Sequence, residues 1–383
     1  MTAGTDGPEP GAATGSGNAT GSGSGSPAGR GTVQTVTGAV PATELGLVLP
    51  HEHLFNDLSA VLAEPAYEFS RTLPGQPVRA ANSWALRADP YCCPDNLAAK
   101  SVEDVLGEVA AFQRAGGGTV VDVTSSAAIG RDPARLRETA LRSGLTVVMG
   151  CGAYLEKSEG ERLTARTVEQ LADAVDAELR YGVTEFGVDR DGAQLRVRPG
   201  VIGEIGVSPH FTDAERASLR AAALAQLNHP HVPLMVHLPG WQRRAHDVLD
   251  VVLEEVGVRA ERVVLAHMDP SGADTAYQDS LAERGVWLEF DMIGMDVTFP
   301  GEGAAPAPAC TADAVARLAD RGHAAQLLLS HDVFLKQMWT RNGGNGLLYV
   351  PTVFAELLAA RGVDAAAVAR LTRDNPARML ADG

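Results

Sequence analysis

The chain has 383 residues, of which 45% are hydrophobic and 21% are charged, an ordinary composition for a globular protein with a large core. Its formal net charge of −16 argues against nucleic acid or an anionic membrane as a partner. No run of 18 apolar residues and no signal-peptide core is present, and the four cysteines show neither metal-binding nor paired spacing. We therefore expect a cytoplasmic protein.

The first 31 residues are mostly Gly, Ser, Ala, Thr and Pro. Such a segment cannot bury enough apolar surface to offset its ordering entropy, so the sequence predicts a disordered tail over 1–31 and one folded domain over 32–383. An approach segment from residue 32 leads to the first strand. Residues 54–96 form a long irregular stretch with five prolines, which we expect to lie over the mouth of the domain.

Short apolar runs then alternate with segments of helical periodicity. The first predicted strand ends at residue 53. The other seven span 119–123, 145–149, 200–205, 232–237, 262–267, 286–290 and 326–332. The predicted helices span 101–115, 132–142, 167–181, 212–227, 245–256, 273–284, 311–321, 347–361 and 364–380. Eight such units are typical of a (β/α)8 barrel of the α/β class, and a doubly wound open sheet is the alternative.

Five of these strands carry imidazole or carboxylate side chains at or near their carboxyl ends. The residues are His51, His53, Glu204, His237, His267 and Asp332. Such groups are costly inside a buried strand unless something pairs with them, and in a closed barrel these strand ends converge on one face. The pattern indicates shared divalent ions at that face. Zinc suits these ligands best, although manganese, cobalt or iron would also fit.

Three stretches resemble the phosphotriesterase family of the amidohydrolase superfamily. They read Pro-His-Glu-His-Leu at 50–54, Gly-Val-Ile-Gly-Glu-Ile-Gly at 200–206 and Ser-His-Asp-Val-Phe at 330–334. Residues 82–96 and the Gly-Gly-Asn-Gly motif at 343–346 are most similar to the phosphotriesterase-related branch. The resemblance covers about 32–383 and implies a metal-dependent hydrolase with two metal ions.

The resemblance also implies a role for each ligand. His51, His53 and Asp332 would hold the buried ion, and His237 and His267 the more exposed one. Glu204 would bridge the two ions, in the place where the best-known members carry a carbamylated lysine. A hydroxide shared by the ions would then attack an ester-type bond in a lactone, a carboxylic ester or a phosphoric ester, with Asp332 also acting as the catalytic acid and base.

Two alternatives to ester hydrolysis stay open at this point. One is an amidase acting on small N-acyl amides, and the other is a non-catalytic protein that keeps the metals and binds a ligand. The expected partner is a small-molecule substrate, and a homodimer is the expected assembly because it is the commonest one.

Other residues have less specific signals. Tyr154 follows the third strand as in lactonases and is the predicted substrate contact. Met292 stands where paraoxon hydrolases carry His and quorum-lactone hydrolases carry Arg, which argues against efficient organophosphate hydrolysis. Asp122 and Asp291 are candidates either for hydrogen bonds to the ligand histidines or for packing support. His331 should lie on the outer face, because neighbouring residues of a strand point to opposite sides.

Overall fold

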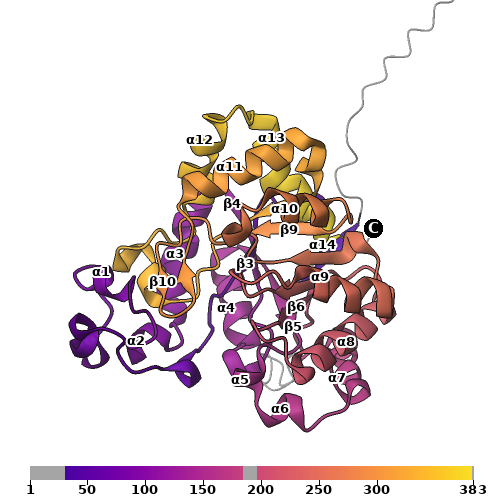
Figure 1. Cartoon of the computed structure of the whole chain (residues 1–383), viewed down its shortest axis with the longest axis horizontal. Helices are drawn as coiled ribbons and strands as arrows, with labels where there is room; N and C mark the ends of the chain where they lie inside the picture. Colours follow the sequence, from indigo (N-terminus) through magenta and orange to yellow (C-terminus); the bar gives the residue numbers. More distant parts are fainter. Residues whose placement is uncertain (1–30, 184–195, 382–383) are drawn as a thin grey trace, which may run out of the picture.

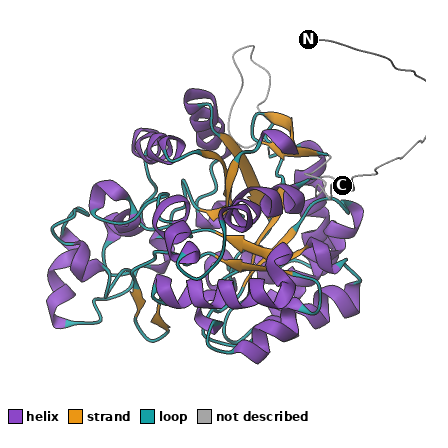
Figure 2. Ribbon diagram, turned by 90° about the horizontal axis from the view of Figure 1, so that it is seen from above, coloured by secondary structure: helices purple, strands orange, loops and turns teal. Residues whose placement is uncertain are grey.

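Eight short apolar runs form the parallel strands of one sheet, in the order β12-β9-β8-β7-β6-β5-β4-β3. The computed structural model describes residues 31–183 and 196–381, so the tail predicted over 1–31 lies outside the described residues except for Gly31. Figures 1 and 2 show the sheet at the centre of the molecule with helices around it. The strands are β3 (Leu47–Glu52), β4 (Gly117–Asp122), β5 (Thr146–Cys151), β6 (Val201–Gly206), β7 (Leu234–His237), β8 (Val263–Leu265), β9 (Trp287–Phe290) and β12 (Leu327–Leu329).

The first and last strands of this sheet also meet, which closes the sheet into a barrel. The backbone N–H of Asp332, three residues after β12, donates to the carbonyl oxygen of His51 on β3 at 3.2 Å. The N–H of His51 donates to Oγ of Ser330 at 3.1 Å. The predicted (β/α)8 barrel is therefore confirmed, and the alternative open sheet is excluded.

Helices connect the strands, as parallel pairing requires. Ser101, Thr167 and Thr212 each start a helix by accepting a hydrogen bond from the backbone N–H three residues later. The helix predicted over 364–380 is interrupted by a π-helical turn at Arg370–Asp374.

Within the described residues, no helix has both the length and the apolar character needed to cross a membrane. The helices are α1 (Ser83–Leu86), α2 (Pro94–Leu97), α3 (Val102–Arg114), α4 (Pro133–Ser143), α5 (Glu156–Glu159), α6 (Glu161–Thr164), α7 (Val168–Tyr181), α8 (Asp213–Asn228), α9 (Ala245–Leu249), α10 (Thr275–Ala282), α11 (Pro308–Leu318), α12 (Ala355–Ala359), α13 (Ala365–Ala369) and α14 (Asn375–Leu380).

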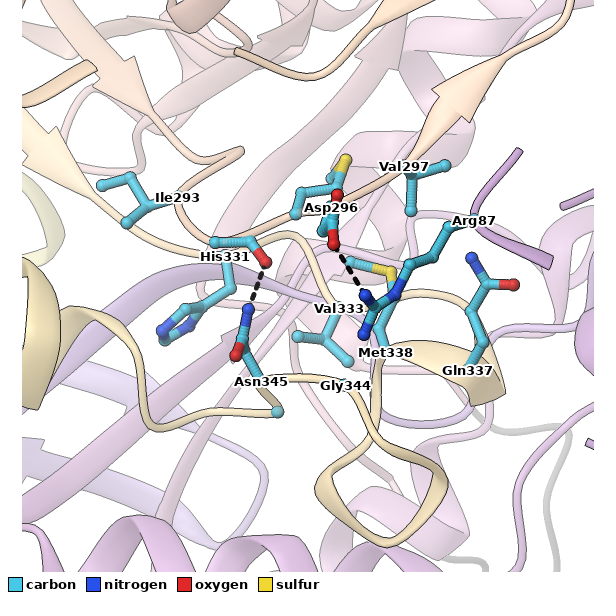
Figure 3. Close-up of a pocket in the computed structure, with 13 residues that line it drawn as sticks. Arg87, Ile293, Asp296, Val297, His331, Val333, Gln337, Met338, Gly344 and Asn345 are labelled. Atoms are coloured by element: carbon cyan, nitrogen blue, oxygen red, sulfur yellow. Dashed lines mark hydrogen bonds and ion pairs between the residues drawn. The ribbon is translucent and has the colours of Figure 1, made fainter. Parts of the chain in front are cut away.

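Two irregular excursions follow β3 and β9. The first covers residues 54–96 and contains α1, and the second contains the short hairpin of β10 (Thr298–Phe299) and β11 (Gly303–Ala304). Arg87 of the first excursion forms an ion pair with Asp296 of the second at 2.8 Å, drawn as a dashed line in Figure 3. The two excursions are thus tied to each other beside a cavity of only about 20 Å³, which has room for about one water molecule.

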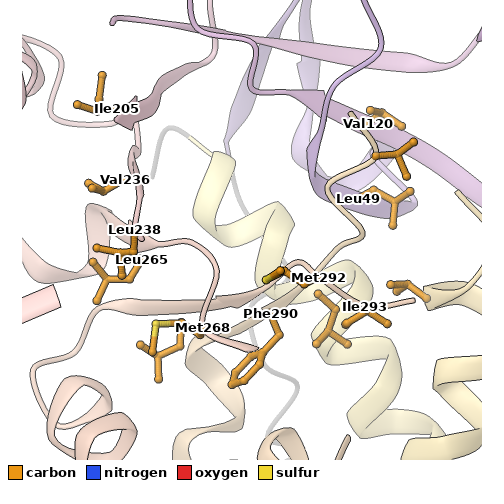
Figure 4. Packing of buried hydrophobic residues seen from close by; sticks show 14 of the residues in the cluster. Leu49, Val120, Ile205, Val236, Leu238, Leu265, Met268, Phe290, Met292 and Ile293 are labelled. Atoms are coloured by element: carbon orange, nitrogen blue, oxygen red, sulfur yellow. The ribbon is translucent and has the colours of Figure 1, made fainter. Parts of the chain in front are cut away.

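Residues two apart on a strand point to the same side of the barrel wall. On β9, Leu288 and Phe290 face the large apolar cluster between barrel and helices, part of which Figure 4 shows. Trp287 packs in a second cluster, inside the barrel, with a residue from each of the other seven strands: Val48, Val121, Val148, Val201, Met235, Val264 and Leu328. Two residues beyond Trp287 the inward position is Glu289. The interior thus changes from apolar to polar towards the carboxyl ends of the strands.

A hairpin that the sequence analysis treats only as an approach segment packs against the interior cluster. Its strands, β1 (Thr32–Thr35) and β2 (Gly38–Pro41), pair antiparallel. Val33 of β1 joins the interior cluster together with Met379 and Leu380 of α14. Both termini of the domain therefore cover the amino-terminal end of the barrel, which leaves the carboxyl end as the place for a site.

Candidate metal centre

Glu204 lies at the middle of a cluster of imidazoles at the carboxyl end of the barrel. Its Oε1 atom is 3.3 Å from Nε2 of His53. Its Oε2 atom is 3.0 Å from Nδ1 of His237 and 3.6 Å from Nε2 of His267. The same Oε2 is 3.5 Å from Nε2 of His51. The two oxygens of one carboxylate thus face imidazoles from four different positions of the chain.

Asp332 completes the cluster. Its Oδ1 atom is 3.2 Å from Nε2 of His53 and 3.8 Å from Nε2 of His51. Asp332 and His267 were predicted to lie inside strands, but β12 and β8 end at Leu329 and Leu265. Beyond these ends the backbone turns, and His267 and Asp332 adopt φ angles of 58° and 53°. All six predicted ligands are nevertheless brought together.

The charges of the cluster attract cations. Burial raises the pKa of Glu204, but His237 and the hydrogen bonds with His267 and His53 outweigh that effect and hold it well below the usual value. Burial lowers the pKa of His53, yet its hydrogen bonds with Asp332 and Glu204 raise it to about 9. These buried carboxylates thus favour positive charge at the neighbouring nitrogens.

The donor set fits divalent metal ions. Three groups made only of predicted ligands place one ligand atom per residue within 4.8 Å of one another: His51–His53–Glu204, His51–His267–Asp332 and Glu204–His237–His267. Among the described residues, the buried Nε2 of His51 has no hydrogen-bond partner, although it points at the carboxylates. Imidazole nitrogen and carboxylate oxygen are ordinary zinc ligands, so an ion would satisfy a buried nitrogen that forms no hydrogen bond.

Carboxylates outside the cluster orient its imidazoles. Nδ1 of His51 lies 2.9 Å from Oε2 of Glu289, and Nδ1 of His267 lies 2.8 Å from Oδ1 of Asp291. A carboxylate accepts only from a protonated nitrogen, so each Nδ1 carries a proton and each Nε2 faces the cluster as the atom that can bind a metal. Nε2 of His267 lies there 2.8 Å from Nδ1 of His237. Asp291 therefore has the first of the two roles considered for it. Glu289 was not predicted. Its position two residues before Asp291 places it on the same face of β9, but nothing local to that strand shows that His51 lies opposite it.

Asp122, the other residue considered for a hydrogen bond to a ligand histidine, acts indirectly. Asp122 accepts hydrogen bonds from the backbone N–H groups of Leu54 at 2.6 Å and Thr124 at 3.1 Å, rather than from a ligand histidine. The Oγ1 atom of Thr124 then lies 2.9 Å from Nδ1 of His53. Asp122 thus shapes the backbone that positions the group next to His53.

We expect Asp291→Asn to weaken metal binding by roughly 10–100-fold, because an amide oxygen is a poorer acceptor for the Nδ1 proton of His267 than a carboxylate is. Competition with a chromophoric chelator measures the affinity. Asp279→Asn, which breaks an ion pair with Arg317 on the outer helices, is the matched control and should leave the affinity unchanged. Equal affinity of Asp291→Asn and the wild type would contradict the orienting role.

The cluster opens into a cavity of about 210 Å³. Its wall is largely apolar and includes five aromatic side chains: Tyr91, Tyr154, Trp241, Phe299 and Phe334. The hydroxyl of Tyr154, the predicted substrate contact, lies 3.4 Å from Nδ1 of His237. Met292 also lines the cavity, where the sequence analysis notes the lack of a His or Arg. Lys157 and Glu302 are the charged lining residues outside the metal cluster.

A closed barrel with polar side chains gathered at the carboxyl ends of its strands defines an enzyme architecture. The model of the phosphotriesterase family matches residues 31–380. The chain belongs to the phosphotriesterase family, whose members are hydrolases that depend on a binuclear metal centre. The resemblance noted in the sequence is therefore confirmed, as is the hydrolase class.

The relatives cover almost the whole chain. An N-acetyltaurine hydrolase from Salmo salar is 30% identical, over 91% of this chain and 98% of that protein. A phosphotriesterase-related protein from Nematostella vectensis is 28% identical over the same shares of both chains. The solved structure of a resiniferatoxin-binding protein from Rhodobacter sphaeroides is 41% identical, with a TM-score of 0.84, over 92% of this chain and 95% of that one.

Proposed function

We propose that this chain hydrolyses an ester-type bond, in a lactone or carboxylic ester, of a small and largely apolar substrate. The observation that carries this proposal is the position of the cluster around Glu204, which forms the floor of an aromatic cavity. A polar, cation-attracting floor suits the bond that is cut, and the apolar wall suits the remainder of the substrate.

The residues divide into two groups for metal binding. His51, His53 and Asp332 would hold one ion and His237 and His267 the other. His53 faces one oxygen of Glu204 and lies 3.2 Å from Asp332, whereas His237 and His267 face the other oxygen. His51 lies between the two groups, 3.5 Å from the second oxygen and 3.8 Å from Asp332. When bound, such ions polarise a carbonyl group and lower the pKa of water from 15.7 towards about 7. Glu204 is already a carboxylate, so the centre needs no lysine modification to assemble.

The protein groups supply the proton transfers and the orientation. Asp332 lines the cavity, and its carboxylate can accept the proton of the attacking water and pass it to the leaving group. Tyr154 reaches the edge of the centre beside His237, where its hydroxyl can donate a hydrogen bond to the substrate. The aromatic wall excludes water from the acyl group and strengthens these polar interactions.

Hydrolysis of an N-acyl amide is the second candidate. Its support is the name of the full-length relative, an N-acetyltaurine hydrolase, since 98% of that protein aligns with this chain. Ester and amide hydrolysis place the same demands on the attacking water, and they differ in the leaving group that must be protonated. Asp332 can serve both reactions, so substrate comparison has to separate them.

Metal removal tests the proposal. We expect dialysis against a chelator to lower the rate of ester hydrolysis by at least about 1,000-fold, because the ions contribute several kcal/mol to transition-state stabilisation. Adding back zinc should restore the rate at about two ions per chain. Elemental analysis and initial rates on the same samples provide the measurement. A chelated protein that keeps its full rate would exclude metal-dependent hydrolysis.

A panel of matched substrates then separates the candidates. It contains lactones, aryl esters and N-acyl amides with the same acyl group, together with a phosphotriester. Faster turnover of esters and lactones than of amides supports the first candidate, and the reverse order supports the second. Turnover of none of them by protein with verified metals would favour a binding role, as the name of the resiniferatoxin-binding relative suggests.

A further inference from the structure

Glu52 is the middle residue of the His51-Glu52-His53 motif, and its side chain takes no part in the cluster around Glu204. Its side chain is fully buried. Its Oε1 atom accepts hydrogen bonds from Oγ of Ser330 at 2.9 Å and from both the backbone N–H and Nδ1 of His331, at 3.0 and 2.8 Å. Its Oε2 atom accepts from the backbone N–H of Val333 at 2.9 Å. All of these donors come from one short segment after β12.

The segment that Glu52 binds is the one that carries Asp332. The donors belong to the two residues before Asp332 and the one after it, so the chain on both sides of Asp332 is bound to a single carboxylate. Asp332 itself has a φ of 53°, a left-handed conformation that few residues other than glycine adopt without support. A buried carboxylate with four donors is a strong acceptor site and can provide that support.

His331 links the Glu52 carboxylate to the helical segment that begins at Val350. Its Nε2 atom accepts a hydrogen bond from the backbone N–H of Val350 at 2.9 Å, so Nδ1 carries the proton that is donated to Glu52. The ring is buried, and with Val333 it lines the small cavity of Figure 3. His331 was predicted to lie on the outer face of its strand, and on this side of the barrel wall its side chain is buried.

We propose that Glu52 is a positioning residue for Asp332. It fixes the turn from Ser330 to Val333 and so holds the Asp332 carboxylate beside His53, where the distance between Oδ1 and Nε2 is 3.2 Å. The His-Glu-His motif then acts on both sides of β3. Its histidines face the centre, and its glutamate builds the turn that delivers a further ligand. This inference rests on the metal centre of the proposed function.

The test is Glu52→Gln. Glutamine keeps the size of the side chain, but its NH₂ group replaces one acceptor and must face either the N–H of Val333 or the donors of Ser330 and His331. We expect a folded protein whose zinc affinity is roughly 10–100-fold lower, measured by chelator competition. We also expect an altered absorption spectrum of the cobalt-loaded protein and a lower kcat at nearly unchanged KM.

Glu108→Gln is the matched control. Glu108 is also buried and also binds the chain after β12, where it accepts from Oγ1 of Thr340 at 2.6 Å, but it lies away from Asp332. This variant should lose stability while keeping the wild-type zinc affinity and cobalt spectrum. Equal losses of zinc affinity in both variants would show a general effect of a loosened loop and would overturn the proposal.

The remaining outcomes are also decisive. Wild-type zinc affinity and an unchanged cobalt spectrum in Glu52→Gln would overturn the positioning role and leave the proposed function intact. Wild-type protein that binds no metal would instead overturn the proposed function. If Glu52→Gln does not fold, Glu52→Asp takes its place, because it keeps the charge and withdraws the carboxylate from the donors of Ser330 and Val333 by one methylene. A smaller loss of zinc affinity then supports the proposal, and no loss contradicts it.

Discussion

Asp332→Asn is expected to lower kcat by about two to four orders of magnitude, the usual contribution of a positioned acid or base. Asparagine keeps the shape of the side chain and an oxygen that can contact a metal, but it cannot take a proton from water at neutral pH. The variant should therefore still fold and should keep much of its bound metal. Initial rates on the best substrate of the panel, circular dichroism and elemental analysis make the measurement.

Asp296→Asn is the control for this experiment. Asp296 pairs with Arg87 near the mouth of the barrel and takes no part in the cluster, so its replacement should leave kcat within about twofold of the wild type. Full activity of Asp332→Asn on a verified substrate, with metals bound, would rule out Asp332 as the acid and base.

Glu204→Gln should reduce bound metal from about two ions per chain to one or fewer and abolish turnover. The amide has one oxygen and no charge, whereas the Glu204 carboxylate faces His53 with one oxygen and His237 with the other. Metal counting by elemental analysis makes the measurement. In the wild type, added bicarbonate should not change metal loading, because a glutamate supplies the bridge without carbon dioxide.

Glu215→Gln tests whether any buried glutamate would behave in the same way. Glu215 is 1% exposed and binds the start of α8 through Ser208 and Thr212, outside the cluster. It should lower stability without changing the metal count. Two ions bound by Glu204→Gln, or loading of the wild type that depends on bicarbonate, would exclude Glu204 as the bridging carboxylate.

The residues that could be predicted from the sequence are those whose signal is local. A buried parallel strand is a short apolar run, and a charged side chain at its end stands out because it would be costly there without a partner. Glu204 and His237 are clear examples, since Glu204 lies in the second half of an apolar run that the structure confirms as β6, and His237 ends the run that forms β7. Closure of the barrel then brings such residues together.

The residues that could not be predicted depend on segments far apart in the chain. Glu289 shows a function only when His51 is known to lie 2.9 Å away, and Glu52 only when its donors after β12 are known. The left-handed turns at His267 and Asp332 follow from such contacts rather than from local propensity. The β1–β2 hairpin has too few residues to be distinguished from extended loop by periodicity alone.

The contacts between the first and last strands that close the barrel have a consequence for biosynthesis. His51 and Ser330, whose hydrogen bond joins the first barrel strand to the last, are 279 residues apart. A growing polypeptide on the ribosome therefore carries His51 and His53, the first two of the six proposed metal ligands, for most of its synthesis without the aspartate that completes the set. On the proposed ligand assignment, both ions can bind tightly only after the last strand has been synthesised and has joined the barrel. A protein with both ions bound is therefore one whose barrel is complete.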